Sequence, residues 1–189
     1  MSGLLKHLGV LTIAGGLLLP FTLSAQSRDH EDAFVPGSAS DSRIAREVRH
    51  ELVMLPYYGV FDDLAFRVDG GVVTLLGSVT RPTLKSDAEN VVKKVEGVTR
   101  VVNTIKVLPL SSLDDRIRMA AYRAIYGDSS LSTRYGYRAV PSIHIIVANG
   151  HVTLEGVVSN EGDKNLVNLR ANSVSGVFSV TNNLRVSAN

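Results

Sequence analysis

The apolar positions between residues 41 and 109 change their period from helical to alternating and back. In residues 43–55 they recur at helical spacing, and Ser42 offers a side chain that can cap the helix. Residues 64–79 then alternate in two runs around a pair of glycines, which is typical of a β-hairpin. This first part of the chain therefore predicts one helix followed by two strands.

A helical period returns over residues 84–95, and Gly97 is placed to end that helix in the left-handed conformation. Residues 101–107 alternate again and predict a third strand. The order is then helix, strand, strand, helix, strand. Because each helix has a single apolar stripe, we expect both to pack on a three-stranded sheet, which gives an α+β fold.

The same order of elements returns in the second half of the chain. A shift of 79 residues aligns residues 64–107 with residues 143–186. Many positions are identical, among them Gly71/Gly150, Val73/Val152, Thr74/Thr153, Leu75/Leu154, Gly77/Gly156, Gly97/Gly176, Val98/Val177, Asn103/Asn182 and Val107/Val186. The sequence therefore predicts two tandem copies of an α-β-β-α-β unit.

The two copies differ most between the first helix and the first strand. The opening helices match, since DSRI at Asp41 corresponds to DDRI at Asp114, but here the shift is 73, so the second copy has six additional residues. These residues fall within residues 126–142. We assign the first domain to residues 41–109 and the second to residues 110–189.

The N-terminal segment has a different character. A positive charge precedes a short apolar run, and small residues end the segment at Ala25. This pattern is typical of a secretory signal over residues 1–25 and predicts export to the periplasm, with an uncleaved anchor as the alternative. About a dozen apolar residues are too few to span a bilayer of roughly 30 Å. Residues 26–40 are polar and contain a Pro-Gly pair, which predicts a flexible linker.

The amino-acid composition limits the classes of protein to which this chain can belong. The 20 Lys and Arg nearly balance the 18 Asp and Glu, which gives no general reason to expect a nucleic-acid partner. The sequence has no Cys, so its stability rests on packed cores, and an acyl anchor on Cys is excluded.

Residues with catalytic or metal-binding chemistry do not form a recognisable set. His144 and His151 lie on opposite sides of one expected hairpin, but two histidines without a carboxylate or Cys make a weak zinc site, and we favour solvated strand positions. The acidic pairs Asp62-Asp63 and Asp114-Asp115 are interpreted as turn and N-cap residues. The repeated glycines suit turns, helix ends and strand bulges. We therefore predict a protein that is not an enzyme and has no metal site or cofactor.

Two segments in each copy carry a family resemblance. DGGVVTLLGSV with VEGVTRVVNTIKV in the first copy, and ANGHVTLEGVV with VSGVFSVTNNLRV in the second, resemble the BON domain of bacterial envelope proteins. The resemblance implies a non-enzymatic role at the cell envelope, with phospholipid or membrane contact. A signal followed by two such domains is also similar to a group of osmotically inducible periplasmic proteins.

The predicted helix over residues 113–126 offers a candidate contact with lipid. Its expected core stripe is Leu113, Ile117, Ala120, Ala121 and Ala124. Tyrosine rings and Arg side chains then face outward, and such residues suit a headgroup layer because rings straddle apolar and polar regions while Arg meets phosphate. With the RYGYR segment, the predicted lipid-binding residues are Met119, Tyr122, Arg123, Tyr126, Arg134, Tyr135, Tyr137 and Arg138. The alternative is that these tyrosines pack inside the protein.

The first copy has a different cluster at the corresponding place. Tyr57, Tyr58 and Phe61 have no adjacent Arg, and two Asp follow them. We expect them to pack in the core or between the domains. The predicted function is binding to an anionic phospholipid surface in envelope maintenance under stress, and the alternative is a periplasmic adaptor that binds envelope proteins.

Overall fold

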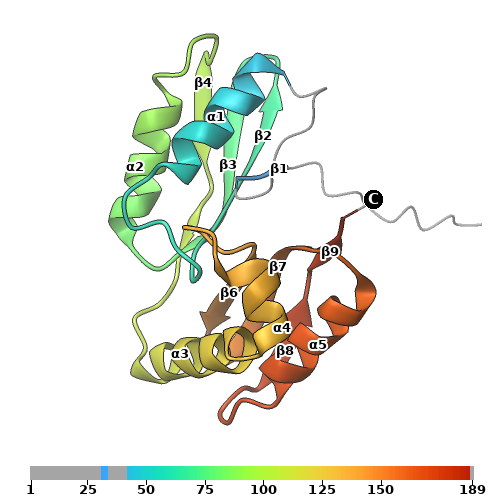
Figure 1. Cartoon of the computed structure of the whole chain (residues 1–189). Coiled ribbons are helices and arrows are strands. Elements are labelled where there is room, and N and C mark those ends of the chain that lie inside the picture. The colour runs from blue at the N-terminus through green and yellow to red at the C-terminus, as the bar shows by residue number, and fades with distance from the viewer. Residues whose placement is uncertain (1–30, 34–41, 188–189) are drawn as a thin grey trace, which may run out of the picture.

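The structure is a computed structural model and describes residues 31–33 and 42–187. Two α+β units follow one another along the chain (Figure 1). The expected signal and most of the expected linker lie outside the described residues, whereas Ser42 caps the first helix as predicted. No helix in the described part of the chain is long and apolar enough to cross a bilayer.

The first unit packs two helices on one face of a sheet. The helices are α1 (Arg43–Val53) and α2 (Pro82–Val92). The strands are β1 (Glu31–Asp32), β2 (Asp63–Asp69), β3 (Val72–Val79), β4 (Arg100–Asn103) and β5 (Lys106–Val107). Their order is β1-β2-β3-β4, with β5 also paired to β3. Strands β2 and β3 form an antiparallel hairpin, and β4 and β5 run parallel to β3.

The second unit repeats this arrangement. Its main helices are α3 (Ser112–Tyr126) and α5 (Glu161–Asn172). Its strands are β6 (Ile143–Ala148), β7 (His151–Val158), β8 (Ser179–Asn182) and β9 (Arg185–Val186), in the order β6-β7-β8 with β9 also paired to β7. The additional residues form α4 (Ser129–Leu131) and a π-helical turn, η1 (Ser132–Gly136). The predicted α+β fold of two α-β-β-α-β units is confirmed.

The third strand of each unit is interrupted. We expected one strand over residues 101–107, but β4 and β5 are separated by two residues. At the break, the side-chain amide of Asn103 donates to the carbonyl of Lys85 in α2 (2.9 Å), and its oxygen accepts from the amide of Ile105 (3.2 Å). Asn182 makes the equivalent bonds in the second unit. The repeated Asn therefore ties the interrupted strand to the second helix of its unit.

Each unit has its own hydrophobic core. The largest fully buried side chains of the first core are Phe66, Leu52, Leu64, Leu75, Leu84 and Ile105, and those of the second are Ile117, Ile125, Leu131, Ile143, Ile145 and Leu154. Among the described residues, the buried core positions run from Ala33 to Leu184. A chain that begins at residue 26 therefore contains every core residue that the structure describes.

Part of the expected linker is paired with the first sheet. Glu31 and Asp32 form β1 and lie opposite Phe66 and Ala65 of β2, and Ala33 is buried in the first core. Arg185 of β9 donates to the carboxylate of Asp32, so the second unit contacts this strand directly. Residues 31–33 thus belong to the folded part of the chain, where the sequence predicts a flexible segment.

Asp114 does not cap α3 as predicted. The cap is Ser111, whose hydroxyl accepts from the amide of Asp114 (3.2 Å). The Asp114 side chain is fully buried and accepts from the amides of Asn149 and Gly150, both at 2.8 Å. These two residues form the β6–β7 turn, and their φ angles are 53° and 80°. Both angles lie in the left-handed region, which glycine adopts without steric strain because it has no Cβ atom. Asp114 therefore holds the hairpin turn against α3.

Candidate functional site

The buried face of α3 is rotated relative to the predicted stripe. Its buried residues are Asp114, Ile117, Arg118, Ala121, Ile125 and Tyr126. Leu113, expected in the core, is exposed, and Ala120 and Ala124 are only partly buried. The prediction of a core stripe was wrong for these three residues, because Ile125 and three polar side chains take the buried positions.

Two of the predicted lipid-binding tyrosines are core residues. Tyr126 is buried, and its hydroxyl donates to the carbonyl of Ile143 (2.7 Å). Burial raises the pKa of Tyr126 far above its ordinary value. Tyr135 is also buried, and its hydroxyl donates to Asp163 (2.5 Å) and accepts from the amide of Ser159 (2.9 Å). Neither ring can reach a membrane in this structure.

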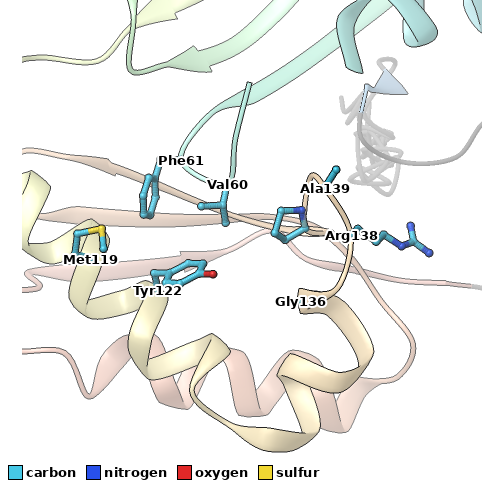
Figure 2. A pocket seen from close by; sticks show the side chains of 8 residues that line it. Val60, Phe61, Met119, Tyr122, Gly136, Arg138 and Ala139 are labelled. Atoms are coloured by element: carbon cyan, nitrogen blue, oxygen red, sulfur yellow. The ribbon is translucent and has the colours of Figure 1, made fainter. Parts of the chain in front are cut away.

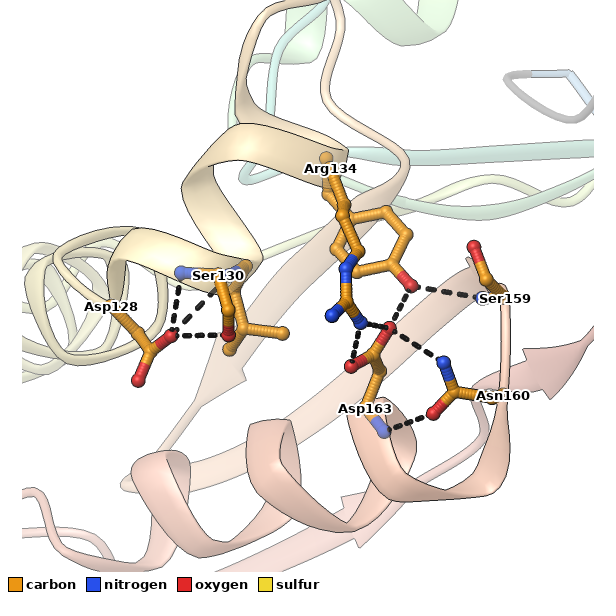
Figure 3. Close-up of polar contacts among 8 residues, drawn as sticks. Asp128, Ser130, Arg134, Ser159, Asn160 and Asp163 are labelled. Atoms are coloured by element: carbon orange, nitrogen blue, oxygen red, sulfur yellow. Dashed lines mark hydrogen bonds and ion pairs between the residues drawn. The ribbon is translucent and has the colours of Figure 1, made fainter.

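Arg134 is held by an ion pair. Figure 3 shows its guanidinium against the carboxylate of Asp163, which also accepts from Tyr135 and from the side-chain amide of Asn160. Burial alone would raise the pKa of Asp163, but the bonds from Tyr135 and Arg134 outweigh burial and lower it. Arg134 therefore fastens the additional segment to the start of α5 and is not free to bind phosphate.

The remaining five predicted residues are exposed and define what we call the α3 face: Met119, Tyr122, Arg123, Tyr137 and Arg138. Met119, Tyr122 and Arg123 follow one another at i, i+3 and i+4 on α3 and so share one side of the helix. Met119 is 45% exposed, Tyr122 36% and Tyr137 83%. Arg116 is also exposed and lies one helical turn before Met119 on the same side of α3. It was not among the predicted residues, although its spacing of three residues from Met119 indicates the shared side.

A groove of about 360 Å³ runs beside the α3 face. Its lining comes from Val60 and Phe61 of the first unit, from Met119 and Tyr122 of α3, and from Gly136 at the end of η1 with Arg138, Ala139 and Pro141 of the loop that follows (Figure 2). The Phe61 and Tyr122 rings meet edge to face with their centroids 6.2 Å apart. The spacing of apolar residues in the sequence did not indicate that residues 60 and 61 line this groove.

The first unit inserts residues 58–62 into an edge of the second. The amide of Ile145 in β6 donates to the carbonyl of Val60 (2.8 Å), and Phe61 packs against the second core. The ring of Tyr58 stacks on His144 with centroids 5.7 Å apart. Tyr58 and Phe61 thus pack between the units, as predicted. We call residues 58–62 with His144 the inter-unit junction.

Asp62 organises the junction from the first unit. Its carboxylate accepts from the amide and hydroxyl of Thr80 at 2.7 and 2.8 Å, and from the amide of Gly59 at 3.2 Å. This geometry agrees with the predicted turn role of Asp62. Tyr57 differs from its prediction, because it is 72% exposed and lies under the guanidinium of Arg81, 4.7 Å from the ring centroid.

His144 is not a solvated strand residue. It is fully buried, and its Nδ1 donates to the carbonyl of Asp62, since a carbonyl oxygen can only accept. Burial lowers the pKa of His144 to about 4, although backbone hydrogen bonds oppose that shift. His151 is exposed and contacts the hydroxyl of Ser179 (2.7 Å). The two histidines face different partners across the hairpin, and the described residues contain no cluster of three potential metal ligands among His, Cys, Asp and Glu.

A sequence model of the BON domain matches residues 40–109 and 129–188 of this chain. The chain therefore belongs to the BON domain family. The second match begins after α3. Since α3 packs on β6 and α5, it nevertheless belongs to the second unit.

One curated protein and two solved structures of a second protein show similarity to this chain. Osmotically-inducible protein Y of Escherichia coli (strain K12) is 29% identical over 130 residues, which is 65% of this chain and 61% of that protein. The chain thus matches 61% of the length of this curated relative. Two structures of CdsD, a structural protein of the type III secretion system of Chlamydia trachomatis, each have a TM-score of 0.28. They are 14% and 12% identical and cover 78% and 76% of this chain and 99% and 93% of their own.

Proposed function

We propose that this protein is a non-enzymatic protein of the cell envelope that binds the surface of anionic phospholipid membranes through its α3 face. The observation that carries the proposal is the exposure of large apolar and aromatic side chains beside Arg123 and Arg138. The expected signal supports a periplasmic location. Similarity to osmotically-inducible protein Y supports a role in osmotic stress.

The chemistry of the α3 face suits a headgroup layer. Met119, Tyr122 and Tyr137 can enter the boundary between headgroups and acyl chains, where amphipathic rings are favoured. Arg123 and Arg138 can contact phosphate, and Arg116 adds a third positive charge on the same side of α3. Asp115, the nearby acid, is paired with Arg118 at 2.5 Å, so its charge is compensated.

The expected affinity is modest and depends on salt. Each basic residue near an anionic surface contributes about 1 kcal/mol, and the attraction falls off within a Debye length. Two or three Arg side chains therefore give reversible binding that weakens as ionic strength rises. A buried aromatic interface with a protein would not weaken in this way.

A protein-binding adaptor is the second candidate. The groove between the units favours it, because Val60, Phe61, Met119 and Pro141 form an apolar concave surface that a partner's side chain could enter. Binding of such a partner should persist at high salt.

Sedimentation with liposomes tests the membrane proposal. The chain from residue 26 onward is mixed with vesicles of phosphatidylglycerol and phosphatidylcholine in graded ratios. We expect binding to rise with the anionic fraction, and the double change Arg123→Gln with Arg138→Gln to weaken it by roughly thirtyfold, since about 2 kcal/mol is removed.

The matched control changes two exposed Arg of the first unit, Arg67→Gln with Arg100→Gln. This pair alters the net charge equally and should leave binding almost unchanged. Equal losses in both double variants would show that binding follows net charge rather than the α3 face. A wild-type chain that stays in the supernatant at low salt would exclude direct membrane binding.

A further inference from the structure

We propose that the groove between the two units binds a single acyl chain of an anionic amphiphile, with the anionic head at Arg138. This inference deepens the proposed function and depends on it only in part, because the groove could also bind a free amphiphile. The lining combines an apolar floor with one charged residue, which are the two features that such a ligand requires.

The size of the groove suits one chain. Sites for small ligands in proteins typically enclose about 300–1,000 Å³. At about 360 Å³ this groove lies at the lower end of that range, enough for one linear chain and too small for a complete two-chain lipid. A chain bound here would lie directly beside the α3 face.

The apolar side chains that line the groove are accessible to solvent. Met119 and Tyr122 retain 45% and 36% of their accessible surface, and Val60 and Phe61 stand opposite them. Large apolar side chains gathered in a concave surface mark interaction sites. Met119 is unbranched and flexible, so it can adjust to a methylene chain that has no fixed shape.

The charge is placed at one end. Figure 2 shows Arg138 at the end of the groove away from Phe61 and Met119. Of the described residues that line the groove, Arg138 alone is charged. A ligand with an apolar tail toward Met119 and a negative head toward Arg138 would complement both ends.

An extended peptide fits this site less well. Peptides commonly add to the exposed edge of a sheet through main-chain hydrogen bonds. Here the amide of Ile145, on the edge strand β6, already donates to the carbonyl of Val60. An acyl chain forms no hydrogen bonds along its length, so the existing hydrogen bond at the edge of β6 does not weaken its binding.

Methionine methyl groups give a direct test. Beyond residue 26 the chain has two methionines, Met119 in the groove and Met54, which is exposed on the first unit. The chain from residue 26 onward is labelled with ¹³C in its methionine methyl groups and titrated with monomeric dodecyl phosphate. We expect the Met119 signal to shift saturably while the Met54 signal stays fixed.

Two variants and two other probes complete the test. Ala139→Trp places a large ring in the groove from an exposed position and should abolish the Met119 shift, while an unchanged Met54 signal reports intact folding. Arg138→Gln should weaken dodecyl phosphate binding at least several-fold. Inorganic phosphate should leave Met119 unshifted, and a neutral twelve-carbon alcohol ligand should bind more weakly than the phosphate ester.

The outcomes separate this proposal from the membrane function. If wild type sediments with anionic vesicles but Met119 does not respond to dodecyl phosphate, the groove proposal is wrong and the surface function stands. A Met119 shift without vesicle binding supports the groove and excludes the surface function. Parallel shifts of both methyl groups, or a full response to inorganic phosphate, would overturn the groove proposal.

Discussion

Asp114→Ala should lower the free energy of unfolding by about 3 kcal/mol, because the amides of two turn residues, one of them buried, lose a fully buried acceptor. The carboxylate is fully buried, and its oxygens lie 2.8 Å from the amides of Asn149 and Gly150. Both turn residues have positive φ angles, so the turn cannot easily rearrange to find other partners. Urea unfolding of the chain from residue 26 onward measures the loss.

Two further variants sharpen this prediction. Asp114→Asn keeps the shape but can offer only one acceptor oxygen, so we expect a loss of about 2 kcal/mol. Asp115→Ala is the matched control, because Asp115 is exposed and its partner Arg118 keeps its bond to the carbonyl of Val147. Because the buried Arg118 loses one of its two acceptors, the cost should be about 1.5 kcal/mol, half of that for Asp114→Ala. If Asp114→Ala were as mild as Asp115→Ala, the buried carboxylate would not hold the turn.

Acidification should destabilise the inter-unit junction through His144. Its pKa of about 4 in the folded protein lies below the 6.5 of an unperturbed histidine, because burial disfavours the charged ring. Between these values the unfolded chain binds a proton that the folded chain does not. Stability from this group is therefore complete above pH 6.5, falls as the pH drops, and is lost by about pH 4. The expected loss is about 3 kcal/mol.

The same proton uptake favours any state in which His144 reaches water, including one in which the two units separate. Unfolding curves recorded from pH 7 to pH 4 test the prediction. His144→Asn retains an amide that can donate to the carbonyl of Asp62 but cannot titrate, so the decline in stability over this range should become about 3 kcal/mol smaller. His151→Asn, which changes an exposed histidine, should keep the wild-type decline. An unchanged decline in His144→Asn would assign the pH dependence to other groups.

The fold could be predicted from the sequence because, in both copies, the spacing of apolar residues changes between helical and alternating and glycines mark the turns. The buried face of α3 was not, because apolar periodicity cannot show a buried Asp, Arg or Tyr. Tyr126 is buried by virtue of its bond to Ile143, and Arg118 by its bonds to Asp115 and Val147. Asp115 lies only three residues before Arg118, but Ile143 and Val147 are 17 and 29 residues from their partners, and contacts so distant in sequence leave no local pattern.

The candidate surface was predicted only in part for the same reason. Tyr135 and Arg134 belong to a RYGYR segment that suggests a membrane contact, yet Asp163 of α5 binds both of them. For the junction, the sequence indicated that Tyr58 and Phe61 are packed but not which residues they contact, because Val60 and Phe61 reach the second unit from a segment with neither helical nor alternating period. What remained exposed after these contacts, the α3 face, is a subset of the residues that the sequence indicated.

The most direct test of the central claim uses the absence of Cys from the chain. A single Cys at position 137 (Tyr137→Cys) or at position 54 (Met54→Cys) is labelled with an environment-sensitive fluorophore. Both native side chains are exposed, one on the α3 face and one on the first unit. On adding anionic vesicles at low salt, we expect the label at position 137 to shift to the blue and the label at position 54 to stay unchanged. Equal shifts at both positions, or a shift at position 54 alone, would contradict membrane binding through the α3 face.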